Sequence, residues 1–302
     1  MTYEIQEFPP LSWSVSRMRM LQECPRKYFY NYYAYHNGWL RDADRESKLI
    51  YRLKKLQSID SLFGQFFHEN VKDTVRCGKT EIFVPDRFRR KLNRTIKTAY
   101  LESKNSMDDW VTHPGWYCMI SEVYYEGDIP QGKKNSIIDR VNVTSGNVSN
   151  CKSFRELTEE EVEIFELDEL KSFEINGLTA YVKIDALYRL ANKVIIVDWK
   201  TGRESLKDVD QLILYTWYAH KILGLKLTDI EARLEYISQN KLEVYNFGEE
   251  ELELVDRRLV LDSKRINHYL IDSDKNQPLP KEKFYQVKCG TVCKYCNFRE
   301  AC

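Results

Sequence analysis

Apolar and polar positions alternate along the chain from about residue 161 onward, which is the pattern of β-strands. The alternation runs through residues 161–175 (EVEIFELDELKSFEI) and 178–190 (LTAYVKIDALYRL), and the turn dipeptide Asn176–Gly177 between them predicts a hairpin. Residues 193–201 (KVIIVDWKT) contain the unbroken apolar run VIIV, which is typical of a central strand covered on both faces. Residues 230–238 (IEARLEYIS) predict one more strand.

Helical spacing of apolar residues marks much of the remaining chain. The segments expected to be helical are a first helix within residues 11–33, followed by residues 58–75, 84–103, 208–223 and 248–270. Ser14 or Ser16 would cap the first of them, and Pro25 would break or restart it. Residues 105–150 show the weakest pattern, and their turn-rich stretches PQGKKNS and TSGNVSN predict loops with a few short strands. Helices before and after a group of strands predict an α/β (α+β) fold.

The composition is that of an ordinary soluble globular protein, with 43% hydrophobic and 30% charged residues among 302. The 46 basic and 46 acidic residues cancel, so a polyanionic partner would have to meet a local basic groove. No apolar run reaches the roughly 18–20 residues that span a bilayer, and the N-terminus MTYEIQEFPP lacks the pattern of a signal peptide. We therefore expect a cytoplasmic protein without a membrane partner, whose eight cysteines are thiols or metal ligands rather than disulfides.

Two acidic residues and a lysine stand on two neighbouring predicted strands. Asp185 lies in YVKIDALY, and Asp198 and Lys200 lie in VIIVDWKTG, where residues i and i+2 of a strand point together. Carboxylates that converge from neighbouring strands suit Mg²⁺ or Mn²⁺, and a lysine beside the metal can position a water and offset phosphate charge. An isolated Asp-x-Lys is usually a solvated strand face. Here, however, Asp198 and Lys200 end a fully apolar strand, where burying a charge is costly unless the charge has a functional role.

The same residues carry a family resemblance. The sequence IDALYRL…VIIVDWKTG…DQLILYTWYA resembles the core of the RecB-like branch of the PD-(D/E)XK nuclease superfamily, which implies a restriction-endonuclease-like core with a central mixed sheet flanked by helices. In that branch an Asp, an Asp-x-Lys and a Gln-x-x-x-Tyr helix form the active site. The resemblance implies catalytic roles for Asp185, Asp198, Lys200, Gln211 and Tyr215. The last two share a helix face, from which they would brace the DNA or the catalytic lysine.

The resemblance also implies further metal ligands. The sequence FGQFFHENV matches the early helix on which the family carries a histidine, so His68 and the Trp199 carbonyl would join the two aspartates around the metal. Without the resemblance, a lone histidine in an amphipathic helix would be interpreted as a partly buried, hydrogen-bonded side chain. Glu169 is the candidate for an additional acid on the first core strand, with Glu166 and Asp168 as alternatives.

Three cysteines close the chain in the sequence VCKYCNFREAC. Cys293 and Cys296 form a C-x₂-C pair, and Cys302 follows six residues later, which is metal-ligand spacing with one ligand missing from a four-ligand site. The spacing alone fits zinc and an iron–sulfur cluster equally well. Cys289 lies four residues before Cys293, and we expect it to be a bystander.

A known subset of RecB-like nucleases supplies the fourth ligand from far away. This subset, which includes the AddB nuclease domain and the CRISPR-associated RecB-like exonucleases, takes one cluster ligand from its N-terminal helix and three from its extreme C-terminus. LQECPRKYFYNYY and CKYCNFREAC are similar to those two motifs. The ligands that the resemblance implies for a [4Fe–4S] cluster are Cys24, Cys293, Cys296 and Cys302. The cluster would join residues 11–35 and 286–302 into a clasp.

The implied activity is metal-dependent hydrolysis of DNA by an exonuclease that acts on single-stranded ends or flaps. Residues 1–302 would form a single domain, and residues of about 100–160, which the resemblance does not cover, would be an insertion that sets substrate or partner. One alternative is a non-catalytic Fe–S subunit for DNA binding or assembly, and another is a CRISPR spacer-acquisition nuclease rather than a DNA repair or phage enzyme. No Gly-rich Lys-Ser/Thr loop is present, so any helicase would be a separate partner.

Affinity for DNA would come from basic side chains that contact the phosphates. The candidates are Arg17, Arg19 and Arg26 near the N-terminus and Arg90 and Arg94 in the helix of residues 84–103. A solvated helix face is an equally good interpretation of either group. Tyr28, Tyr32 and Trp199 would stack on unpaired bases, unless the aromatic run of residues 28–35 is core. Val182 stands where the family often has Gly, and its side chain would narrow the approach of the DNA backbone.

Overall fold

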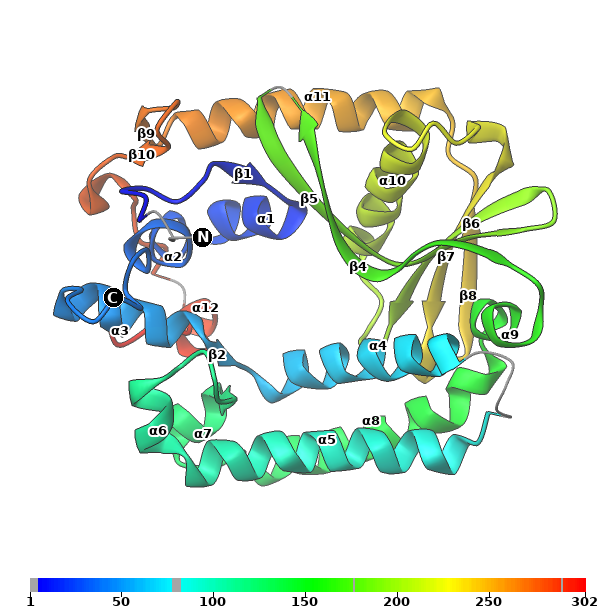
Figure 1. Ribbon diagram of the computed structural model, residues 1–302, viewed down its shortest axis with the longest axis horizontal. Helices are drawn as coiled ribbons and strands as arrows, with labels where there is room; N and C mark the ends of the chain where they lie inside the picture. Colours follow the sequence, from blue (N-terminus) through cyan, green and yellow to red (C-terminus); the bar gives the residue numbers. More distant parts are fainter. Residues whose placement is uncertain (1–4, 78–82, 176, 289) are drawn as a thin grey trace.

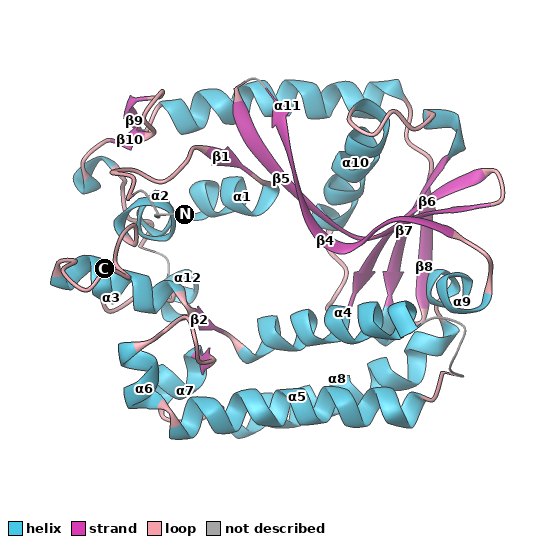
Figure 2. Cartoon of the chain, in the orientation of Figure 1, coloured by secondary structure: helices cyan, strands magenta, loops and turns pink. Residues whose placement is uncertain are grey.

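The structure is a computed structural model that describes residues 5–77, 83–175, 177–288 and 290–302. Within this part of the chain, two layers of helices enclose a six-stranded mixed sheet (Figures 1 and 2), which confirms the predicted fold class. Asn176 and Cys289 lie outside the described residues, so the hairpin turn and the bystander role expected of them stay predictions.

The sheet follows the order β1–β5–β6–β7–β8, with β4 on the other edge of β5. Its strands are β1 (Ser12–Trp13), β4 (Glu163–Ile175), β5 (Leu178–Leu190), β6 (Lys193–Lys200), β7 (Ile230–Tyr236) and β8 (Lys241–Tyr245). The pair β6–β7 is parallel, whereas β4–β5, β5–β6 and β7–β8 are antiparallel. The strands predicted by alternation are thus confirmed, and VIIV forms the buried centre of β6.

Strand β5 divides one of its edges between two partners. Residues 186–190 pair with β6, while Thr179 and Ala180 pair with β1. None of the described strands pairs with residues 181–185 on that edge. The pairing of β6 with β5 ends at Val197, so residues 198–200 continue beside β7 alone. We call this divergence of β5 and β6 the fork.

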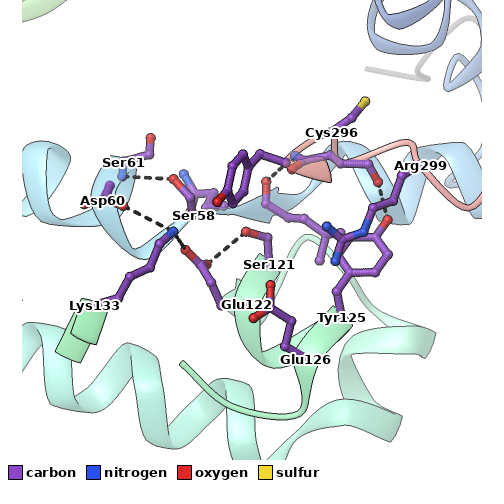
Figure 3. A pocket seen from close by; sticks show the side chains of 14 residues that line it. Ser58, Asp60, Ser61, Ser121, Glu122, Tyr125, Glu126, Lys133, Cys296 and Arg299 are labelled. Carbon is purple, nitrogen blue, oxygen red and sulfur yellow. Dashed lines mark hydrogen bonds and ion pairs between the residues drawn. The ribbon is translucent and has the colours of Figure 1, made fainter. Parts of the chain in front are cut away.

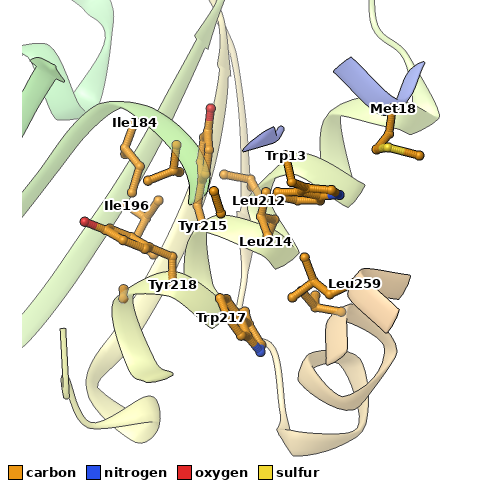
Figure 4. Close-up of a cluster of buried hydrophobic side chains, with 14 of the residues drawn as sticks. Trp13, Met18, Ile184, Ile196, Leu212, Leu214, Tyr215, Trp217, Tyr218 and Leu259 are labelled. Atoms are coloured by element: carbon orange, nitrogen blue, oxygen red, sulfur yellow. The ribbon is translucent and has the colours of Figure 1, made fainter. Parts of the chain in front are cut away.

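The helices cover the two faces of the sheet. One layer contains α1 (Val15–Glu23), α10 (Leu206–Lys221) and α11 (Glu249–Asn267), and the other contains α4 (Ile59–Cys77), α5 (Pro85–Asn105), α8 (Gln131–Asn147) and α9 (Lys152–Glu159). Figure 4 shows the core of the first layer, where Ile184 and Ile196 of the sheet pack with Leu212 of α10 and Leu259 of α11. The predicted helices are confirmed, and Ser14 caps α1 by accepting a hydrogen bond from the Arg17 N–H.

The middle of the chain differs from its prediction, because it is helical where loops and short strands were expected. Most of PQGKKNS and TSGNVSN lies inside α8. Ile137, Val141 and Thr144 are buried on one face of that helix, at the spacing of successive turns. Packing of this face against the second helical layer stabilises a helix that its Gly, Ser and Asn residues disfavour, since tertiary contacts supply most helix stability in proteins.

Shorter elements complete the molecule. They are α2 (Pro25–Phe29), a π-helical turn (Tyr30–Ala34), α3 (Arg45–Lys54), β2 (Leu56–Gln57), α6 (Met107–Thr112), β3 (Met119–Ile120), α7 (Ser121–Glu126), β9 (Leu270–Asp272), β10 (Gln277–Pro278) and α12 (Gly290–Lys294). Single 3₁₀ turns occur at Val148–Asn150, Leu227–Asp229, Ile237–Gln239 and Lys281–Lys283. Among the described residues, no helix combines the length and apolar character needed to cross a membrane.

Candidate active site

The fork opens into a cavity of about 610 Å³. Its walls come from α1, the middle of α4, β4, β5, the end of β6 and the middle of α10. The predicted residues His68, Asp185, Asp198, Trp199, Lys200, Gln211 and Tyr215 all line it. Val182 also lines the cavity, with a buried side chain. The structure therefore brings the predicted active-site residues together, and we call this cavity the active-site cavity below.

Asp185 lies at the point where β5 parts from β6. Its Oδ2 accepts a hydrogen bond of 2.7 Å from the backbone N–H of Trp199. That N–H lies beyond the last residue of β6 that pairs with β5, so the carboxylate takes the place of a ladder bond. The side chain of Asp185 is thereby held across the fork, beside Asp198, and each of the two carboxyl groups affects the pKa of the other.

Lys200 is held by a chain of polar contacts that ends on the sheet. Its Nζ lies 2.6 Å from Asp198 Oδ2 and donates a hydrogen bond of 3.2 Å to Gln211 Oε1. Gln211 Nε2 donates to the Tyr215 hydroxyl, which in turn donates to the Lys183 carbonyl at 2.6 Å. The Gln-x-x-x-Tyr pair of α10 thus connects Lys200 to the backbone of β5 and restricts the positions that the ammonium group can take.

His68 reaches the cavity from α4. Its Nδ1 lies 3.3 Å from Asp185 Oδ1, yet this buried nitrogen makes no hydrogen bond in the described part of the molecule. Burial lowers the pKa of His68, which favours the neutral ring that can act as a ligand. As placed, the described residues include no group of three His, Cys, Asp or Glu side chains arranged to hold a metal ion. An unsatisfied imidazole nitrogen beside two carboxylates is nevertheless a donor set that suits a divalent cation.

The two carboxyl groups are difficult to ionise together. Burial raises the pKa of Asp185 to about 6, although the Trp199 N–H opposes the shift. Burial, and then the charge of Asp185, raises the pKa of Asp198 to about 7, while Lys200 lowers it. Burial opposes the charge of Lys200, but the attraction of Asp198 leaves the pKa of Lys200 above its ordinary value. A bound cation would relieve the repulsion between the two carboxylates.

We expect the substitution Asp198→Asn to raise the melting temperature of the metal-free protein at pH 8. The unfolded carboxyl has a pKa of about 3.9, below its folded value of about 7, so the ionised form destabilises the fold. The folded state binds a proton on Asp198 more tightly than the unfolded state does, so the wild-type protein becomes more stable as the pH falls from 8 towards 6. The difference in melting temperature between the variant and wild type should therefore shrink. A change of 1 kcal/mol in the free energy of unfolding corresponds to a shift of about 2–4 °C in the melting temperature.

Thermal melts in EDTA at pH 8 and pH 6 measure this difference. The exposed substitution Asp86→Asn on α5 serves as the control, and its effect should be small at both pH values. An Asp198→Asn protein that melts below wild type at pH 8, or by an amount that does not change with pH, would contradict the expected repulsion between the two buried carboxylates.

The additional acid on β4 is a correction to the sequence prediction. Glu169, the expected residue, forms ion pairs with Arg76 (2.9 Å) and Lys171 (3.0 Å) and does not line the active-site cavity. Asp168 lines it instead, with Oδ1 at 2.6 Å from Lys183 Nζ. Asp168 adopts φ = 47°. It lies opposite Asp185, between the paired residues Leu167–Ala186 and Glu169–Ile184 of β4 and β5. This local distortion interrupts the alternation of β4, so the sequence pattern could not show which acid faces the cavity.

Several residues expected to contact DNA are buried. Arg17 is only 3% exposed, because its guanidinium packs against Tyr28 and Tyr32 and donates a hydrogen bond of 3.0 Å to the Tyr28 hydroxyl. Tyr28 and Trp199 are also buried and present no face to a base. Tyr32 is half-buried, and the Arg17 guanidinium lies over its ring at 4.3 Å. The interpretation of this aromatic run as core is therefore the better one.

The other basic candidates lie in different places. Arg26 donates a hydrogen bond of 2.8 Å to the Phe284 carbonyl and so helps to hold the two ends of the chain together. Arg90 and Arg94 are exposed on α5, which packs on the side of α4 that faces away from the sheet (Figure 1), and neither lines the active-site cavity. Arg19 does line it, together with Gln65 of α4, which the sequence did not single out. Gln65 precedes His68 by three residues, so helical spacing could have identified it.

The four predicted cluster ligands also meet in one place. Cys24, Cys293, Cys296 and Cys302 line a cavity of about 240 Å³. Burial raises the pKa of Cys296, and the neighbouring Cys24 and Cys302 thiols raise it further, whereas Lys27 lowers it. Lys27, Lys288 and Arg299 line the same cavity and would offset the charge of thiolates. As placed, these cysteines do not form a metal-binding group among the described residues.

The C-terminal tail is fixed to β2 and to α7. The Tyr125 hydroxyl donates a hydrogen bond of 2.5 Å to the Asn297 carbonyl, and Asn297 Nδ2 donates one of 2.8 Å to the Leu56 carbonyl. Figure 3 shows the cavity of about 520 Å³ that these segments enclose next to Cys296. Lys133 lies 2.7 Å from Glu122 and neutralises the buried carboxylate there. The tail is thus part of the folded molecule.

One family model matches the chain over nearly its whole length. Residues 12–302 match the family model of the PD-(D/E)XK nuclease superfamily. A search of curated proteins found no match. A solved structure described as "Crystal structure of SSO0001" is 20% identical and covers 60% of this chain and 79% of that chain, with a TM-score of 0.27. The family match includes the fork, the active-site cavity and both cysteine-bearing ends. The chain belongs to the PD-(D/E)XK nuclease superfamily.

Proposed function

We propose that this protein is a Mg²⁺- or Mn²⁺-dependent deoxyribonuclease of the RecB-like type, which acts as an exonuclease on single-stranded DNA ends or flaps. The observation that supports this most is the meeting of Asp185, Asp198 and Lys200 in one cavity, at a fork of the sheet. Nucleases of this superfamily use divalent metals, and the buried carboxylates offer oxygen ligands of the type that such metals take.

The proposed metal ligands are His68, Asp185, Asp198 and the Trp199 carbonyl. A bound divalent metal supplies a more acidic water and polarises the scissile phosphate. Asp185 is held across the fork by its bond to the Trp199 N–H, so its free oxygen is directed to the cavity without reorganisation. His68 Nδ1 makes no hydrogen bond with any described residue, which favours its use as a ligand.

Lys200 orients the attacking water and offsets charge on the phosphate. Gln211 holds the ammonium group at 3.2 Å, and Tyr215 holds Gln211 against β5, so that the lysine stays beside Asp198. Arg19, which lines the cavity from α1, is the basic residue proposed to contact the backbone of the DNA strand. Its guanidinium is fixed by a hydrogen bond of 2.9 Å to the Lys207 carbonyl.

The proposed cofactor of the cysteine cavity is a [4Fe–4S] cluster held by Cys24 and the three cysteines of the tail. The four thiols line a single cavity although they come from opposite ends of the chain, and basic side chains surround them. Such a cluster would close the clasp between residues 11–35 and 286–302, which already make direct contacts such as the bond of 2.7 Å from the Tyr30 hydroxyl to the Ala301 carbonyl. Zinc on the same thiolates is the competing assignment.

The direct test is a cleavage assay with wild-type protein and end-labelled DNA. We expect single-stranded DNA to be degraded in Mn²⁺ or Mg²⁺, with no degradation in EDTA and slower degradation of blunt duplex. Labels at the 5′ end and at the 3′ end, in separate substrates, report the polarity, and a circular single strand separates an exonuclease from an endonuclease. Protein with bound metal that cleaves none of these substrates would instead support a non-catalytic DNA-binding subunit.

A further inference from the structure

A second groove, with a volume of about 910 Å³, lies at the end of the molecule that carries α3 and α6 (Figure 1). One wall is formed by residues 38–52, and the other by residues 111–116. Strand β2 follows the first wall in the chain, and strand β3 follows the second. The two strands pair with each other and so hold the two walls together. None of the described residues that line the groove is acidic. We call it the α3 groove.

The α3 groove concentrates positive charge in a protein whose net charge is zero. Arg45, Lys48 and Arg52 follow one another at helical spacing on one face of α3, and Arg41 adds a fourth cation from the preceding loop. Within the described part of the chain, none of these cations forms an ion pair. Three carboxylates occur in the same segment: Asp44 accepts the Ser47 N–H at 2.9 Å, Glu46 pairs with Lys281 at 2.7 Å, and Asp42 does not line the groove.

The same groove presents aromatic rings to solvent. Trp116 is 76% exposed and Trp39 is 38% exposed, whereas the other four of the six tryptophans are at most 3% exposed. Trp116 stacks on His113 with ring centroids 4.4 Å apart and planes at 13°, so the two rings form a flat platform. Trp39 packs beside Tyr51, with centroids 5.7 Å apart. Exposed rings interleaved with cations are the arrangement that binds unpaired bases and their phosphates.

The shape of the groove depends on a close approach of its loop to α3. A Cβ atom at Gly38 would lie 2.2 Å from the Ser47 carbonyl oxygen and 2.8 Å from Tyr51 Cβ, so only glycine allows this contact. Lys48 Nζ donates a hydrogen bond of 2.7 Å to the Arg41 carbonyl and fixes the other side of the loop. The groove is therefore a packed feature of the fold, in which the loop has a defined position against α3.

We propose that the α3 groove binds a single strand of nucleic acid, with bases stacked on Trp116 and Trp39 and phosphates paired with Arg41, Arg45 and Arg52. This inference rests on the proposed nuclease function, because the strand is the part of the substrate that extends beyond the active-site cavity. Helix α4 connects the two places. It begins at Ile59, directly after β2, and carries His68 into the active-site cavity, a rise of about 14 Å at 1.5 Å per residue.

Tryptophan fluorescence tests the proposal without any cleavage. Since the buried tryptophans are shielded, oligothymidylate of about 20 nucleotides, added in EDTA, should quench the emission of Trp116 and Trp39. Trp116→Ala should remove most of the quenching and weaken binding about tenfold. The double substitution Arg41→Glu and Arg45→Glu should weaken binding further and reduce the slope of log K against log salt by about 0.7 for each phosphate that the protein no longer neutralises.

Matched controls separate the groove from the rest of the molecule. Arg257→Glu, an exposed charge reversal on α11, should leave the quenching unchanged, and an abasic strand of equal length should bind without quenching. The proposal is overturned if wild type is not quenched, if Trp116→Ala retains the full quenching, or if polyglutamate or anionic lipid vesicles quench equally well. Quenching without cleavage in Mn²⁺ would sink the nuclease function alone, and cleavage without quenching would sink the groove alone.

Discussion

Lys200→Ala should lower the single-turnover rate of DNA cleavage by about 10²–10⁴-fold, the range for loss of one positioned catalytic group. The ammonium group lies 2.6 Å from Asp198 and is braced by Gln211, so its loss removes a positioned cation from beside the carboxylate. Binding of Mn²⁺ should persist, because the proposed ligands remain. Rates are measured with excess enzyme in Mn²⁺, and Mn²⁺ binding is measured separately by calorimetry.

The matched control is Lys207→Ala, which removes an exposed lysine from the first turn of α10. It should cleave DNA at nearly the wild-type rate. A Lys200→Ala protein that keeps more than a tenth of the wild-type rate would show that the lysine is not part of the reaction. A variant that is inactive but also melts far below wild type would be replaced by Lys200→Gln, which keeps a polar side chain of similar length next to Gln211.

Cys24→Ala should abolish the bound cluster and destabilise the whole domain. Cys24 is the one cluster ligand that comes from the N-terminal segment, so its loss would open the link between residue 24 and the tail. By analogy with other cross-links, a connection that closes so long a loop contributes on the order of 5 kcal/mol. Iron and sulfide content, visible absorbance of anaerobically purified protein and the melting temperature measure the effect. The variant Cys302→Ala should also lose the cluster and be less stable than wild type.

Cys289→Ala serves as the control and should change neither the iron content nor the stability. Retention of a full cluster by Cys24→Ala would refute the proposed link between the two ends of the chain. A colourless wild-type protein with one zinc per chain would replace the cluster with zinc while leaving the four ligands in place. The cleavage assay remains a separate measurement, since the active-site cavity and the cysteine cavity share no lining residue among those described.

The sequence predicted the part of the fold that depends on short-range pattern. Alternation identified β4 and β5, the run VIIV identified the buried centre of β6, and the spacing of Gln211 and Tyr215 placed both on one helix face. Period and spacing are local properties, and a buried strand or helix face leaves them directly in the sequence. The resemblance then indicated which of these local patterns belong to one site.

Features that depend on contacts between distant segments were not predictable in this way. Arg17 was expected to contact DNA, but its partners are the rings of Tyr28 and Tyr32 in other elements. The distortion that directs Asp168 rather than Glu169 to the cavity depends on how β4 meets β5. The helix α8 forms because its apolar face is covered, although its local propensity is poor.

The fork has a consequence for how this protein can lose its activity in evolution. Asp185 satisfies the backbone N–H of Trp199, which would otherwise be a buried donor without a partner. The Lys200 ammonium group, by contrast, contacts only side chains among the described residues. An inactive descendant can therefore shed the lysine and keep its fold, but the residue at Asp185 has to remain a hydrogen-bond acceptor of similar length. Among inactive proteins derived from this chain, Asp or Asn at position 185 should outlast Lys200.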